Sequence, residues 1–451
     1  MDTLLEITKR GLQASRMAMD VIGNNIANAS TPGYSQQRLD VTSAGYQSGG
    51  LSIGLGVNIQ DIQRLHDNII DQQIRDKQSQ IGSQQEQQKV LQQLQSTLST
   101  QNGQDLDQLI GNFFNSFSNL SNQPEDNTLR NNVINQTQAL TSQFHSLDST
   151  LTSMKGDVAT SIRTDVTQVN GLLSDIATLN KSILSSQNLG HPDNQSLDQR
   201  AQKLQDLSKL VNFTVLKNSN NDYEIRIGGM VVLHNDQSQA LQTEEDTGNN
   251  QMRVRLGNGK ALDITGGSVG ANITNYDKVI PGYQNQLNSL AKNLVEKVNA
   301  IHQTGYDMNG NTGVDFFDPN NTTAKTISLN SVIQNNPQAI AASDTSGATG
   351  NNKIALQIYD LGSSNVINGQ TLQQNATAMA TSAGSDITNL TNSIQTLQSA
   401  KNLLDTQQAS TSGVNLDEQL TNMIKYQNAY QATARVLNTS QQMFQSLISI
   451  L

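Results

Sequence analysis

The side chains that most often carry catalysis or bind metal are sparse and scattered in this chain of 451 residues. We find no HExxH motif, no histidine pair four residues apart and no GxSxG nucleophile elbow. Carboxylates are too dispersed to single out a glycosidase pair. We therefore expect no enzyme, no catalytic residue and no cofactor, and we interpret the histidines as unrelated surface or loop residues. The histidines are His66, His145, His191, His234 and His302.

Two segments approach the pattern of a ligand loop, and each departs from it. Gly266–Gly270 is glycine-rich but lacks the GK[ST] of a phosphate loop, so we predict a turn. Asp307–Asp318 has oxygen-bearing residues at alternate positions, as calcium loops do. Its sixth position is Thr312 instead of glycine, and its last is aspartate instead of glutamate. We interpret it as a polar turn anchored by Phe316 and Phe317, with no metal.

Composition excludes several functional classes. Lys plus Arg number 28 against 38 Asp plus Glu, a net charge of −10, which argues against a broad basic surface for nucleic acid. Cysteine is absent, which excludes disulfides, zinc–thiolate sites and cysteine nucleophiles. No apolar run approaches the ~18 residues that a membrane span needs, so we expect no membrane contact. The first residues lack a basic start followed by an apolar block, so we expect no cleaved signal peptide.

The same composition bounds the architecture. The length predicts roughly three domains. Hydrophobic residues make up 35% of the chain and aromatic residues 4%, so the core must be thin or elongated. Asn and Gln together make up roughly a quarter of the chain, which gives a neutral polar surface with few ion pairs.

Helices that must position any assembly site are predicted at both ends of the chain. Each has apolar residues at alternating spacings of three and four, which is typical of helices that pack against other long helices. The first helix, Thr3 to Asn28, is interrupted by small or polar residues at half of its d positions. We expect the two ends to pair with each other or with other subunits. The first seam contains Leu5, Thr8, Leu12, Ser15, Met19, Ile22, Ile26 and Ala29; the last contains Leu416, Leu420, Met423, Gln427, Tyr430, Ala434, Leu437, Gln441, Phe444, Ile448 and Leu451.

Between the ends, helical patterns enclose a short β-rich stretch. After the first helix, Pro32 and Gly33 fit the central positions of a type II turn, and Arg38 to Ile62 reads as a hairpin or extended flap. A long helix follows from Leu65 to Ser99, with Ile69 on its apolar face. Further helices are predicted at Asp105–Asn119, Asn127–Leu151, Met154–Ser185, Ser196–Leu210, Tyr276–His302, Asn335–Ala342 and Thr371–Ser410.

Short alternating runs replace the helices between Asn212 and Ile264, where Gly228-Gly229 and Asn258-Gly259 signal hairpins. The fold class is therefore mainly α with a small inserted β domain: an elongated, nested chain whose terminal helices pair as a coiled coil. We expect a terminal coiled-coil assembly domain (residues 1–62 and 412–451), a helical-bundle domain (63–211 and 276–411) and an inserted β meander (212–275).

Three stretches resemble the bacterial flagellar axial proteins. These proteins share a first helix that ends in an NNIANxxTxGY/F turn, and residues 24–34 here read NNIANASTPGY. The continuation SQQR after Tyr34 is similar to the hook-associated protein 1 family. So are SGVNLDE at 412–418, YQNAYQATARV at 426–436 and GVDFF at 313–317. The resemblance covers roughly the first 75 residues, residues 260–320 and the last 45.

The resemblance implies a structural part of the flagellum that joins hook to filament. It implies that the terminal helices form the inner tube of the axis and that the chain leaves through the flagellar type III export channel. The implied partners are copies of itself in a helical or ring-like layer, the hook protein, a second junction protein on the filament side, and an export chaperone at the C-terminal helix. It adds residues of the turn to the assembly interface: Asn24, Asn25, Asn28, Pro32, Gly33 and Tyr34.

Other functions are compatible with parts of the sequence. A hook or rod protein is the nearest alternative, and the pairs Tyr34-Ser35 and Tyr426-Gln427 disfavour it. A secreted cell-wall hydrolase requires a compact acid pair or a histidine cluster, and neither is visible. A surface adhesin would bind through the β meander, so binding by a fragment of residues 212–264 would favour it.

Overall fold

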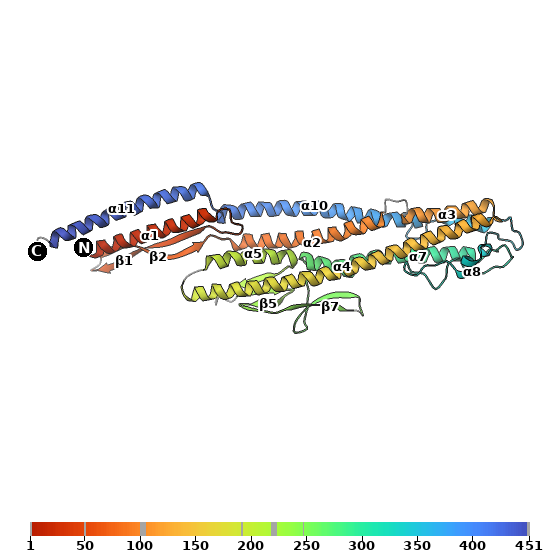
Figure 1. Ribbon diagram of the computed structural model, residues 1–451, viewed down its shortest axis with the longest axis horizontal. Helices are drawn as coiled ribbons and strands as arrows, with labels where there is room; N and C mark the ends of the chain where they lie inside the picture. Colours follow the sequence, from red (N-terminus) through yellow and green to blue (C-terminus); the bar gives the residue numbers. More distant parts are fainter. Residues whose placement is uncertain are drawn as a thin grey trace.

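The computed structural model describes residues 2–48, 51–99, 105–190, 193–217, 223–246 and 248–448. The molecule is elongated, with the two chain termini at the same end (Figure 1). Long helices dominate, and three small antiparallel sheets accompany them. The predicted class, mainly α with a small β part, is confirmed. Within the described residues, no helix is both long enough and apolar enough to cross a membrane.

One end of the molecule is formed by the first and last parts of the chain, which we call the terminal unit. A helix from the start of the chain runs antiparallel to the last helix, and a β-hairpin packs against the first helix (Figure 1). A Cβ atom placed on Gly11 would lie 3.3 Å from Thr433 Cγ2, so glycine permits the close approach of the two helices. The unit consists of α1 (Asp2–Asn28), β1 (Gln37–Ser48), β2 (Leu51–Arg64) and α11 (Leu416–Ile448).

The rest of the chain forms a helical body with one continuous apolar core. Its longest helices are α4, which runs through the whole body, and α10, which lies along α2 (Figure 1). Phe113 lies at the centre of a cluster of aromatic rings that includes Phe117, Phe316 and Phe317. The helices are α2 (Asn68–Leu98), α3 (Leu106–Asn122), α4 (Asn127–Asn188), α5 (Asn194–Leu210), α6 (Gly267–Thr274), the π-helix η1 (Asn275–Val279), α7 (Ile280–His302), α8 (Ser331–Asn335), the 3-10 helix η2 (Pro337–Ala339), α9 (Lys353–Leu361) and α10 (Leu372–Ser412).

Two predictions about the helices before the β insertion were wrong. The predicted helices Asn127–Leu151 and Met154–Ser185 are one helix of 62 residues, because neither Gly nor Pro interrupts residues 152–153 and the apolar row continues across them. Ile69 is 69% exposed, and Ile70 is buried instead. The reason is the N-cap: Asp67 accepts from the backbone N–H of both residues, which sets the rotation of the first turn.

Three further predictions failed later in the chain. Gly266–Gly270 is the start of α6 instead of a simple turn: Gly267 has φ +68°, and a Cβ there would lie 2.3 Å from Leu210 backbone carbon. The predicted helix Asn335–Ala342 is not formed. Helix α8 ends at Asn335, and Pro337 starts a 3-10 turn. Helix α9 was missed altogether.

The strands of the inserted segment pack against α4 as two small sheets. The Gly228-Gly229 pair connects β4 to β5 with φ +55° and +77°, as the hairpin signal predicted. Strand β7 was missed because its sequence, LQTEED, has one apolar residue and no alternation. The sheets contain β3 (Thr214–Lys217), β4 (Tyr223–Ile227), β5 (Met230–His234) and β6 (Gln237–Ser238), then β7 (Leu241–Asp246), β8 (Gln251–Leu256) and β9 (Ala261–Leu262).

Candidate assembly site

The predicted turn motif surrounds one buried amide, Asn25, which is 1% exposed. Its Nδ2 donates to the Gln37 carbonyl (2.8 Å) and to Gln419 Oε1 (3.1 Å). Its Oδ1 accepts from the Gln37 N–H (2.9 Å) and from the Tyr34 hydroxyl (2.8 Å). One side chain therefore ties α1, the turn, the start of β1 and the start of α11 together, and all four of its hydrogen bonds depend on its amide group.

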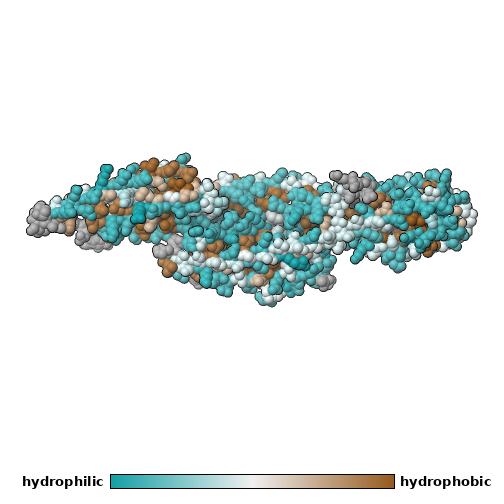
Figure 2. Space-filling view, in the orientation of Figure 1, coloured by the Kyte–Doolittle hydropathy of each residue, from teal (hydrophilic) through white to brown (hydrophobic). Residues whose placement is uncertain are grey.

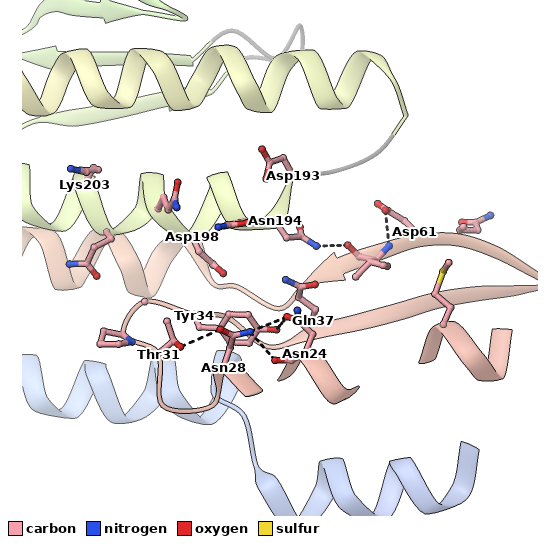
Figure 3. A pocket seen from close by; sticks show the side chains of 18 of the residues that line it. Asn24, Asn28, Thr31, Tyr34, Gln37, Asp61, Asp193, Asn194, Asp198 and Lys203 are labelled. Carbon is pink, nitrogen blue, oxygen red and sulfur yellow. Dashed lines mark hydrogen bonds between the residues drawn. The ribbon is translucent and has the colours of Figure 1, made fainter. Parts of the chain in front are cut away.

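The turn itself has the predicted geometry. The Tyr34 N–H donates to the Thr31 carbonyl, and Gly33 has φ +80°, as the third position of a type II turn requires. The Tyr34 hydroxyl also donates to Asn24 Oδ1 at 2.9 Å, and Thr31 Oγ1 donates to Asn28 Oδ1 (Figure 3). Burial, and after it the nearby charge of Asp198, raises the pKa of Tyr34 to about 12. Tyr34 is therefore a neutral donor to these amides.

The turn faces the N-terminal half of α5 (Figure 3). Asn194, Asp198 and Gln202 are spaced four residues apart, so they share one face of that helix. Asp198 accepts from Arg64 Nε at 2.5 Å and from the Ser35 N–H at 3.3 Å. Sequence reasoning missed these α5 residues, because three polar residues at helical spacing do not differ from an ordinary solvated face.

A cavity of about 880 Å³ lies between the terminal unit and α5. Residues of the motif, including Asn24, Asn28, Pro32 and Tyr34, line one wall. The opposite wall comes from α5 and from the residues before it, and Asp61 of β2 contributes to the rim (Figure 3). Most lining side chains are amides or carboxylates, and apolar groups such as Met17, Ile59 and Ile62 complete the wall.

The predicted seam is only partly used in the contact between α1 and α11. In α1 the buried row consists of four small or polar residues together with Val21 and Ile22. In α11 the buried residues are Gln419 and Ser440. Successive helical residues differ by about 100°, so Leu420 lies roughly a quarter-turn away from Gln419. The buried α1 residues are Thr8, Ser15, Ala18, Val21, Ile22 and Asn25.

Most apolar residues of the predicted seam therefore remain accessible in the single chain. Figure 2 shows an apolar patch over the start of α11. Ile424 (59% exposed) enlarges this patch and was not in the predicted seam, because it lies outside the heptad positions. The exposed members are Leu5 (44%), Leu416 (48%), Leu420 (50%), Tyr430 (39%) and Phe444 (49%), with the polar Gln427 and Gln441; the half-buried members are Leu12, Met19, Ile26, Met423, Ala434 and Leu437. The side chain of Ile448 and the whole of Leu451 lie outside the described residues.

In the segment that resembles a calcium loop, the carboxylate of Asp307 accepts hydrogen bonds from the loop itself. Asp307 accepts from the N–H groups of Asn309 and Asn311, and Phe316 and Phe317 are fully buried beneath. The predicted polar turn is confirmed. Within the described ranges, no three His, Asp or Glu side chains form a group that could hold a metal ion.

The described histidines serve structure at separate places. The prediction of a surface or loop histidine was wrong for His302, which is buried at the end of α7 because both ring nitrogens have backbone partners. Its Nδ1 is bound to the Val314 carbonyl and its Nε2 accepts from the Ala341 N–H. Burial lowers the pKa of His302 to about 4. His66 contacts Asp71, His145 contacts the Ile327 carbonyl and His234 contacts Glu224. His191 lies outside the described residues.

Comparison with known proteins identifies relatives of one kind. A family model described as "Flagellar hook-associated protein FlgK helical domain" matches residues 91–317. Models described as "Flagella basal body rod protein" and "Flagellar basal body rod FlgEFG protein C-terminal" match residues 5–34 and 405–450. These two short matches fall on α1 with its turn and on the end of α10 with α11.

Full-length relatives and a solved structure agree. "Flagellar hook-associated protein 1" of Bacillus subtilis is 24% identical, over 99% of this chain and 97% of that protein. The protein of the same name from Escherichia coli is 26% identical over the whole of both chains. The structure described as "the flagellar hook junction protein FlgK from Burkholderia pseudomallei" has the same fold over 76% of this chain and 100% of that one, with TM-score 0.67 at 16% identity.

Proposed function

Because the chain belongs to the flagellar hook-associated protein FlgK family, we propose that this structural protein joins hook to filament by assembling through its terminal unit. The observation that carries the proposal is the apolar patch on α11. Leu416, Leu420 and Ile424 are about half exposed, while small and polar residues form the contact with α1. A helix that leaves its apolar side open in the single chain is suited to contact with neighbouring subunits.

The physical mechanism is the addition of subunits by repeated, individually weak helix contacts. A head-to-tail interface that does not close on itself builds an open helical array. Each seam is interrupted by polar residues such as Gln427 and Gln441, so stability arises from many copies together. Surfaces rich in Asn and Gln donate and accept hydrogen bonds without requiring an opposite charge. Such surfaces suit a layer that contacts different lattices below and above.

We further propose the partners and the route that this function requires. The partners are other copies of the chain, the hook protein on one side and a second junction protein on the filament side. An export chaperone binds the C-terminal helix, residues 417–451, and the chain leaves through the flagellar export channel without a cleaved signal. The apolar patch supports the chaperone contact, since it would otherwise face water before assembly. The absence of cysteine supports the export route, because no cross-link can form in transit.

The domain organisation of the chain is also part of the proposal. Residues 1–62 and 412–451 form the assembly domain, residues 63–211 and 276–411 the helical bundle, and residues 212–275 the inserted β domain. The distribution of buried apolar residues supports the boundary between the assembly domain and the helical bundle. The continuous core contains buried residues from Val90 to Ala383 and none from the terminal unit.

The proposal is tested first by removing residues 417–451 and examining the cells by electron microscopy. We expect hooks without filaments and filament subunits lost to the medium. Normal filaments would contradict the proposal.

A milder variant separates assembly from export. The double variant Leu416→Ser/Leu420→Ser removes apolar surface that the single chain does not bury, so the purified protein should keep its thermal transition and lose attached filaments. The matched control is Leu403→Ser on α10, which is 70% exposed and lies outside the terminal unit. Equal loss of filaments in the control would show that the effect does not belong to this patch.

A further inference from the structure

The terminal unit and the body are joined without a shared apolar core. The buried apolar side chains of the unit, Val21 and Ile22 among them, are not part of the body's core. The chain passes between the two parts twice, at residues 64–68 and 412–416, and the segment 34–37 that connects α1 to β1 lies beside both crossings. Where these segments cross, the backbone N–H of Gln36 donates to the Ser412 carbonyl, and that of Leu65 donates to the Gln36 carbonyl. Two parts linked in this way pivot easily unless specific contacts hold them.

The face of α5 provides such contacts on three successive turns. Asn194 Nδ2 donates to the Ile62 carbonyl at 2.8 Å. One turn later, Asp198 holds Arg64 and the Ser35 N–H. One turn further, Gln202 Oε1 lies against Gly33, 3.1 Å from where a Cβ would be. The contacts reach two segments of the terminal unit, β2 at Ile62 and Arg64 and the turn at Gly33 and Ser35, so together they define an orientation and not merely an attachment.

The ion pair is the strongest of these contacts. The side chains of Arg64 and Asp198 are 10% and 11% exposed, so water and salt screen their attraction weakly. Among the described residues, it is the one ion pair that joins the terminal unit to the body. Beside it the interface is open, because the cavity of about 880 Å³ separates the turn and β2 from the rest of α5.

We propose that Asn194, Asp198 and Gln202 form a latch that sets the orientation of the terminal unit on the body, with the Asp198–Arg64 ion pair as its principal contact. They are positioning residues: they act through the direction in which they hold α1 and α11. The purpose of the latch rests on the proposed function, since an open helical array repeats the same subunit geometry in every copy. If the terminal unit of one subunit were held at a different angle, the helical body of that subunit would be displaced within the array.

The test measures the orientation directly in the full chain. Because the sequence has no cysteine, nitroxide labels can be attached to Gln13→Cys on α1 and Thr167→Cys on α4, both of which are exposed. Pulsed electron paramagnetic resonance then reports the distance between the unit and the body. We expect one narrow distance in the labelled parent, and its loss to a broad distribution in Asp198→Asn, with the thermal transition of the body unchanged.

Two variants separate a latch from a general structural role. Asp198→Glu keeps the carboxylate and should restore the narrow distance. Lys203→Ala breaks the 2.7 Å ion pair of the same helix with Asp175 on α4, which is a contact within the body, and should leave the distance narrow.

The latch is refuted by a narrow, unchanged distance in both Asp198→Asn and Asn194→Ala/Asp198→Asn. Equal broadening by Lys203→Ala refutes it as well, and so does a broad distribution in the labelled parent. The distance measurement uses purified protein and tests only the latch. The proposed function is tested separately, and normal filaments after removal of residues 417–451 would contradict it. The failure of one proposal is therefore distinguishable from the failure of the other.

Discussion

At the scale of single residues, two neighbouring asparagines of the turn motif have unequal roles. Asn25 is buried and makes four hydrogen bonds to three segments of chain. Asn24 lies on the exposed side of the same helix turn and shares the Tyr34 hydroxyl. A sequence motif lists both residues with equal weight, and only the rotation of α1 against β1 and α11 distinguishes them.

We predict that Asn25→Ala lowers the free energy of unfolding of the terminal unit by about 2–4 kcal/mol, because it leaves buried groups of Gln37 and Gln419 without a partner. Hydrogen exchange of α1 amides under increasing urea measures this change. Asn24→Ala is the control and should cost less than about 1 kcal/mol, because water replaces its lost contact. Equal effects would contradict the assignment of Asn25 as the central residue.

The residues of the assembly site could be predicted from sequence in part. The turn was predicted correctly, because Pro32 and Gly33 constrain the backbone locally. The roles of Asp198 and Arg64 could not be predicted, because 134 residues separate them and nothing local marks either one. The seam was predicted from apolar spacing alone, whereas α1 and α11 approach each other at Gly11 and are hydrogen-bonded through Asn25, both of which such spacing overlooks.

At the scale of elements, the length of α4 determines the length of the body. Its 62 residues correspond to roughly 90 Å at about 1.5 Å per residue. Periodicity predicted helix on both sides of residues 152–153 but placed a break there, because Thr152 and Ser153 are polar. Both side chains face solvent, so the polar pair is simply part of the exposed side of a continuous helix.

We predict that Ser153→Pro, which creates the break, destabilises the body by about 3 kcal/mol, because proline removes a backbone hydrogen bond and clashes with the preceding turn. Ser153→Ala should be neutral or slightly stabilising, since alanine is the better helix former. Urea denaturation followed by circular dichroism compares the two variants. A harmless proline would mean that the two halves of α4 do not need to be continuous.

At the scale of the whole molecule, the nested order of the chain was predictable and the internal β arrangement was not. Apolar seams at both ends predicted that distant segments pair, and the pairs Gly228-Gly229 and Asn258-Gly259 predicted two hairpins correctly. Strand β7 pairs with β8 through its backbone, so its acidic sequence carried no apolar signal. Within residues 91–317, the long helices before about residue 260 were predicted as helices but not recognised as a family feature, because amphipathic periodicity occurs in many unrelated proteins.

We predict that a fragment of residues 63–411 folds alone and keeps the thermal transition of the full chain. The reason is that the continuous core contains no residue of the terminal unit. Differential scanning calorimetry of the fragment beside the full chain checks this. A fragment that unfolds at much lower temperature, or without a cooperative transition, would show that the body depends on α1 and α11 for its stability.

The pairing of Asn25 with Gln419 spans 394 positions of the sequence. A chain that emerges from a ribosome or a narrow pore with its first residue leading exposes α1 long before its partner arrives, so the two-helix contact closes last. A product of premature termination has no α11 to offer and leaves α1 permanently open. The contact thus depends on the full length of the chain: only a polypeptide that includes α11 can close the pair.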